Sequence, residues 1–97
     1  MLKVEVYVPP EALNKITNRV SQFCRSYNGT QNQRLTWYLV QSMWSEQKDE
    51  LDVEYKEEYC VVFRCNENDL DDITRVIKEN HPYTDVTIDV TKLIEHD

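Results

Sequence analysis

This sequence is short of glycine, of proline, of basic residues and of long apolar runs, and each shortage excludes a class of function. Its 97 residues include one glycine and three prolines. Loops that cradle phosphate depend on glycine, which lets backbone N–H groups approach the anion. A helix needs about 20 consecutive apolar residues to cross a bilayer, and no run in the chain approaches that length. We therefore expect neither a glycine-rich phosphate loop nor a membrane protein.

Basic residues are too few for a nucleic-acid-binding surface. The chain has 11 Lys and Arg against 18 Asp and Glu, a net charge of -7, whereas phosphate contacts need clustered basic side chains. The acidic excess is concentrated between Glu46 and Glu58, where seven acids stand against two lysines. This acidic 46–58 loop is either a solvated connection or a recognition surface for a basic protein partner. The candidate surface consists of Asp49, Glu50, Asp52 and Glu54.

Cysteine is scarce and odd in number. Cys24, Cys60 and Cys65 are scattered along the chain, which argues against a disulfide framework and for a reducing compartment. The chain begins with a strand-like alternation instead of the charged and apolar regions of a signal peptide. We therefore expect a cytoplasmic protein.

Hydrophobic spacing predicts six elements in one domain over residues 1–97. Strand patterns occur at about 2–8, 34–44, 59–65 and 86–90, and helical patterns at about 10–27 and 68–80. The order is β-α-β-β-α-β. It predicts an α+β ferredoxin-like sandwich, in which one antiparallel sheet carries both helices on one face.

The second and third predicted strands are apolar on both faces. A strand of this kind is typically buried on both sides, yet the two helices can cover only one face of the sheet. Another subunit would cover the second face, so we expect a homo-oligomer. The alternative is a monomer with scattered aromatic residues on an open face. The candidate interface residues are Tyr38, Val40, Trp44 and Val62.

The sequence offers no convincing catalytic or metal-binding set. Nucleophilic catalysis needs a thiol or hydroxyl with a base beside it, whereas Cys24 falls on the apolar stripe of the first helix, where core packing is the ordinary role. Cys60 and Cys65 are an odd number of strand residues apart, so their side chains face opposite ways. We expect no enzyme activity, no metal site and no cofactor.

A proline turn follows the second predicted helix. Pro82 biases His81 away from helical geometry and helps to end the helix. We expect His81 to cap helix carbonyls and to pack beside Tyr83. The segment His81-Pro82-Tyr83 then shapes the turn that positions the last strand.

Both ends of the chain resemble a known family. The opening Val8-Pro9-Pro10-Glu11-Ala12-Leu13 and the closing His81-Pro82-Tyr83, with Asp89, Val90 and Leu93 beyond it, are similar to the insert domain of Ngg-interacting-factor-three-like proteins, a PII/CutA-like domain. CutA proteins have a tryptophan late in the second strand, then a glutamate that opens an apolar strand ending in a basic residue. Trp44, Glu58 and Arg64 are similar to that pattern. The resemblance implies the same fold and a trimer. Thr84-Asp85-Val86 departs from the family's Glu-Glu-Pro, and the family's glycine-rich segment after the first helix has no counterpart.

These features lead to three functional hypotheses. The first is a regulatory or adaptor module of PII/CutA type, without enzyme activity, that binds a small ligand at subunit clefts or a protein through the acidic 46–58 loop. The second is an acidic inhibitor or nucleic-acid mimic that occupies a basic site on a partner. The third is a CutA-like divalent-metal tolerance protein.

Overall fold

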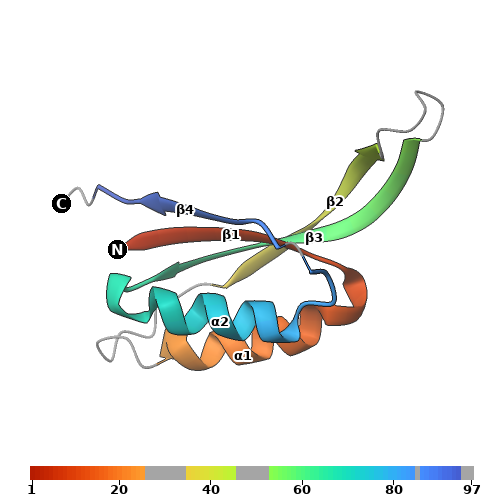
Figure 1. Cartoon of the computed structure of the whole chain (residues 1–97). Helices are drawn as coiled ribbons and strands as arrows, with labels where there is room; N and C mark the ends of the chain where they lie inside the picture. Colours follow the sequence, from red (N-terminus) through yellow and green to blue (C-terminus); the bar gives the residue numbers. More distant parts are fainter. Residues whose placement is uncertain (26–34, 46–52, 85, 95–97) are drawn as a thin grey trace.

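The chain folds as one antiparallel sheet with both helices on one face (Figure 1). The computed structural model describes residues 1–25, 35–45, 53–84 and 86–94, with the backbone alone for 24, 25, 42–45 and 53–55. The sheet order is β2-β3-β1-β4, which confirms the predicted ferredoxin-like fold. The elements are β1 (Leu2–Val8), α1 (Leu13–Arg25), β2 (Thr36–Ser45), β3 (Val53–Cys65), α2 (Leu70–Asn80) and β4 (Ile88–Lys92), with 3-10 turns at Pro10–Ala12 and Glu67–Asp69.

Strand β1 forms the centre of the core because every second residue is apolar. Val4, Val6 and Val8 are fully buried against the helices, as the two-residue period of a strand requires. Strand β1 pairs with β3 along one edge and with β4 along the other. Its backbone N–H and C=O groups therefore find partners on both sides although the strand is buried.

The two helices complete the core through apolar residues four positions apart. Ile16 and Val20 of α1 and Ile73 and Ile77 of α2 have no exposed surface, because side chains at i and i+4 lie on one helix face. They pack with the valines of β1 and with Phe63 of β3 in a single cluster.

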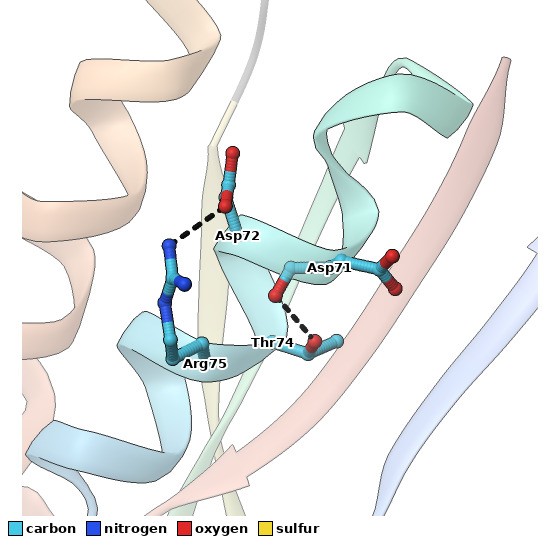
Figure 2. A network of polar contacts seen from close by, with 4 residues as sticks. All are labelled: Asp71, Asp72, Thr74 and Arg75. Carbon is cyan, nitrogen blue, oxygen red and sulfur yellow. Dashed lines mark hydrogen bonds and ion pairs between the residues drawn. The ribbon is translucent and has the colours of Figure 1, made fainter.

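The outer surface of α2 shows that its acidic residues have local roles. Asp71 and Asp72 lie in the first turn, where a carboxylate interacts favourably with the helix dipole. Arg75 approaches Asp72 to 2.7 Å, and the Thr74 hydroxyl donates to the Asp71 carbonyl over 3.0 Å (Figure 2). This ion pair is exposed and contributes little to stability.

The third strand is longer than its residue pattern predicts. The pattern predicts a start at Tyr59, with the acidic segment before it as either a hairpin loop or an extension of the two strands. The second alternative holds for 53–58, because β3 begins at Val53 and pairs with β2 as far as Ser45. Charged residues such as Lys56 and Glu57 mask the strand pattern, but backbone pairing does not depend on them. The second half of the acidic 46–58 loop is therefore strand. The first half, 46–52, lies outside the described residues.

The β2–β3 pair projects beyond the helices as an arm (Figure 1). A 13-residue strand spans about 43 Å, whereas a 13-residue helix spans about 20 Å, so helices of this size cannot cover the full length of β3. The radius of gyration is 15.1 Å, against about 12.5 Å for a compact domain of this length. The long dimension of the molecule is 51 Å. No helix within the described ranges is long and apolar enough to cross a membrane.

Truncation of one core residue should separate core packing from surface effects. We expect Ile73→Ala to lower the free energy of unfolding by about 2–5 kcal/mol, because it removes fully buried methyl groups and leaves a cavity. The matched control is Ile94→Ala, since Ile94 is 96% exposed; its effect should stay within about 0.5 kcal/mol. Urea denaturation of the two variants measures both. Equal effects would contradict the described core.

Candidate functional site

The face of the sheet opposite the helices is the first candidate surface. Strand registers place Tyr7, Cys60 and Tyr38 side by side across three strands on this face. Towards the Leu2 end of the sheet the face becomes charged, and Lys3 forms an ion pair of 3.2 Å with Glu5. This helix-free face therefore combines an aromatic region with a polar one.

Cys60 is fully buried although it lies on the helix-free face. Tyr7 of β1 and Tyr38 of β2 are its cross-strand partners, one on each side. A hydrogen bond between the Cys60 sulfur and the Tyr38 hydroxyl raises the pKa of Tyr38 from 10.0 to about 12, and the charge of an ionised Cys60 adds to the effect. The thiol is thus part of a small polar contact on this face and lies apart from the main core.

Strand β2 forms the edge of the sheet beside this face and is the second candidate surface. Its ten residues include no charged side chain, although 30% of the whole chain is charged. Trp37, Tyr38 and Leu39 are 48%, 51% and 56% exposed. Natural edge strands usually carry charges or prolines that prevent association with another strand. An apolar, uncharged edge of this length can pair with a further chain.

His81 connects the end of α2 to the end of β1. Its side chain is 8% exposed. Nε2 lies 2.8 Å from the carbonyl oxygen of Tyr7, and the backbone N–H of Tyr83 donates to Nδ1 over 3.1 Å. A carbonyl oxygen only accepts, so Nε2 carries the proton and the ring is neutral. The expectation that His81 caps helix carbonyls is therefore wrong, because its carbonyl partner belongs to β1.

Tyr83 extends this cluster towards the base of the β2–β3 arm. Its ring packs beside His81 with centroids 5.0 Å apart, as the sequence indicated. The ammonium group of Lys56, on β3, lies 5.6 Å from the centre of the same ring, within range of a cation–π interaction. The segment His81-Pro82-Tyr83 thus contacts both β1 and β3 at the point where β1 ends.

The candidate interface residues are placed only in part. Tyr38, Val40 and Val62 lie on the helix-free face, and Val62 is opposite Thr36 in the register. The backbone of Trp44 continues the same strand opposite Glu54, but its side chain lies outside the described part of the structure.

The candidate acidic surface lies mostly beyond the described residues. Asp49, Glu50 and Asp52 fall in the gap between β2 and β3, and the side chain of Glu54 is not described. Glu58, at the other end of the acidic segment, is 9% exposed. Glu58 therefore belongs to the packed base of the arm and not to an exposed acidic surface.

The sequence did not predict which apolar residues of β2 would stay exposed. Trp37 and Leu39 share the strand face of the buried Val61, and that pattern alone suggested core positions. The helices bury the two central strands and leave the helix side of β2 uncovered. The Tyr38–Cys60 contact was also missed, because it depends on the register between strands far apart in the sequence.

The described residues hold no group of three His, Cys, Asp or Glu side chains that could bind a metal ion. Cys60 and Cys65 are both buried, and neither forms a disulfide. Cys65 packs in the cluster under the helices and Cys60 on the opposite face, so the two thiols cannot share a ligand.

The fold is that of the CutA1 proteins, which are PII-like. The CutA1 of Pyrococcus horikoshii superposes with a TM-score of 0.76 at 16% identity, over 100% of this chain and 87% of that one. The periplasmic divalent cation tolerance protein CutA of Archaeoglobus fulgidus gives 0.75 at 14% identity, over 99% and 87%. The PII-like protein CutA of Nostoc sp. PCC 7120 gives 0.74 at 19% identity, over 96% and 81%.

No family model matches the sequence, and no curated protein matches it either. At identities of 14% to 19%, the likeness establishes the fold and leaves function to be argued from the residues. The predicted PII/CutA-like fold is confirmed. The resemblance to the insert domain of Ngg-interacting-factor-three-like proteins stays a prediction from the sequence.

The Tyr38–Cys60 contact predicts an unusual alkaline titration. The folded protein holds the Tyr38 proton up to about pH 12, whereas an unfolded tyrosine loses it near pH 10. The contribution of this contact to stability is thus present below about pH 10 and is lost as the pH rises through 12. NMR titration of ring-labelled tyrosine, assigned with Tyr38→Phe, measures this pKa.

We expect Cys60→Ala to return the Tyr38 pKa towards 10, because the hydrogen bond and the neighbouring charge are removed. Cys65→Ala, on the helix side, is the control and should leave the value near 12. If neither substitution changes the Tyr38 pKa, Cys60 is not the hydrogen-bond partner of Tyr38.

Proposed function

We propose that this chain is a self-associating binding module of CutA/PII type, without enzyme activity, whose subunits meet through β2 and the helix-free face. The single observation that supports this proposal best is the uncharged β2 edge with Trp37, Tyr38 and Leu39 half exposed. In a chain with a net charge of -7, copies repel one another, so an interface free of charge is the most favourable place for contact.

The shape of the subunit supports the same proposal. An arm that extends beyond the helices (Figure 1) leaves both sides of a two-stranded ribbon open, and such a ribbon is marginally stable in water by itself. Packing of the arm against neighbouring subunits would supply the missing burial. A closed ring, with the trimer favoured by the family resemblance, would satisfy every edge equally.

Ligand binding in this proposal takes place in the assembly. The clefts between subunits would hold a small ligand, or the acidic 46–58 loop would engage a protein with basic residues. The similarity of the His81-Pro82-Tyr83 ending to the insert domain of Ngg-interacting-factor-three-like proteins supports an adaptor role. The domain would span residues 1–97 and work in the cytoplasm, which two buried cysteines outside any disulfide favour.

A second candidate is a role in divalent-cation tolerance. It is favoured by a specific observation: structural neighbours from Archaeoglobus fulgidus and Thermus thermophilus carry that description. Since the described residues of one subunit hold no metal-ligating cluster, such a site would take ligands from more than one subunit or from residues outside the described ranges.

The solution mass tests the main proposal. We expect a salt-resistant oligomer in light scattering, because apolar contacts are not screened by ions as surface charges are. Tyr38→Lys should weaken association by about thirtyfold or more, the effect of losing a contact of about 2 kcal/mol at an interface. Asn18→Lys, which adds the same charge on the exposed side of α1, should leave the mass unchanged.

A wild-type chain that stays monomeric at every accessible concentration would overturn the proposal. If Tyr38→Lys fails to fold, Leu39→Lys replaces it, since Leu39 is the most exposed of the three edge residues. Circular dichroism checks the fold of each variant before its mass is interpreted.

Calorimetry with Cu²⁺ and Zn²⁺ tests the second candidate. A site shared between subunits should bind metal in the wild-type oligomer and lose that binding in the dissociated Tyr38→Lys variant. Equal binding by both forms would place the metal within one subunit, and no binding by either form would remove the candidate.

A further inference from the structure

The two hydrogen bonds of His81 define its protonation state. Nδ1 accepts from the backbone N–H of Tyr83, and Nε2 donates to the carbonyl of Tyr7, which is 74 positions away in the sequence. A neutral imidazole has one donor and one acceptor nitrogen, and only the form with the proton on Nε2 makes both bonds. The ring is almost fully buried, so water does not readily replace a lost partner.

Protonation of the ring would break one of these bonds. An imidazolium has a proton on each nitrogen, so its Nδ1–H would face the N–H of Tyr83. Two donors then point at each other, and a part-buried N–H is left without an acceptor. The contact to Tyr7 can persist, because Nε2 remains a donor.

The hydrogen bond between the Tyr83 N–H and His81 Nδ1 lies in the connection between α2 and β4. Strand β4 is an edge strand and, within the described residues, pairs only with β1, over five residue pairs. Val90 in its middle is 42% exposed, so side-chain burial holds this strand weakly. Beyond the pairs, the N–H of Leu93 donates to the carbonyl of Met1 over 3.0 Å. At the other end of β4, Val86 and Ile88 pack partly buried against the core, and the turn after His81 precedes them.

We propose that His81 is a pH-sensitive latch. Protonation of the ring releases the turn that begins at Pro82 and loosens β4 from the edge of β1, while the β2-β3-β1 sheet and both helices remain folded. The backbone edge of β1 then becomes available for pairing. This proposal concerns a single subunit and does not depend on self-association.

The surroundings of the ring contain charges of both signs. The ring lies at the end of α2, and the Tyr83 N–H points at its Nδ1. The titratable groups on the neighbouring segments include Tyr7 of β1, Glu11 after β1, Lys56, Glu58 and Tyr59 of β3, Lys78 and Glu79 of α2, and Tyr83 of the turn.

Hydrogen exchange measured by NMR tests the latch. Protection factors are compared between about pH 7.5 and pH 5.5, the range in which histidine ordinarily changes charge. We expect the protection of β4 amides to fall by up to about tenfold per pH unit, the limit for one coupled proton. The amides of Val61 and Phe63 in β3 should keep their protection. A uniform loss across the sheet, or constant protection of β4, would overturn the proposal.

Two variants assign the effect to one residue. His81→Gln removes the titrating group and should abolish the pH response of β4. His96→Gln removes the only other histidine of the chain and should keep the response. A response that persists in His81→Gln, or disappears in His96→Gln, contradicts the latch.

A measurement on the wild-type ring does not depend on whether any variant folds. Long-range ¹H–¹⁵N spectra should show the Nε2–H form of His81 at neutral pH, and its conversion to imidazolium should coincide with the loss of β4 protection. If the Nδ1–H form predominates, or if the two events occur at clearly different pH values, the proposal is wrong even where His81→Gln does not fold.

Discussion

The fold depends on one constraint: β1 is buried against two helices and must have a strand paired along each of its edges. Its valines supply the apolar surface that the helices cover, and its backbone polar groups need partners that water cannot provide there. Strand β3 meets one edge directly after the arm, whereas β4 must be brought to the other edge from the far end of α2. The turn at His81 leads the chain from α2 towards β4, and the His81 imidazole hydrogen-bonds the carbonyl of Tyr7 near the end of β1.

The same arrangement explains where apolar surface stays exposed. Two helices bury the central strands and leave apolar surface on the helix side of both edge strands, at Leu39 of β2 and Val90 of β4. The two edges differ in character, because β2 is uncharged along its whole length while β4 alternates apolar residues with polar ones. A chain folded in this way offers one edge suited to a stable contact and one edge held by few interactions of its own.

Local patterns were sufficient for the order and type of all six elements, since each strand and helix carries its own hydrophobic period. They failed where the decisive partner is distant in the sequence. The composition of the first residues of β3 left a loop and a strand extension open, and pairing with β2 makes them strand. His81 was expected to serve its own helix, and its carbonyl partner instead lies at the end of β1. The burial of Cys60 beside Tyr38 likewise follows from register, which sequence spacing alone does not determine.

The pairing of the first and last strands has a consequence for protein architecture. Leu2 is paired with Lys92, and directly hydrogen-bonded strands hold their backbones about 5 Å apart. The start of β1 and the end of β4 therefore lie at the same corner of the sheet. The distance between them is similar to the distance between the two ends of an ordinary surface loop. A unit of this geometry can be inserted into a loop of a host protein, or joined end to end by a short linker and reopened elsewhere, without bending either strand.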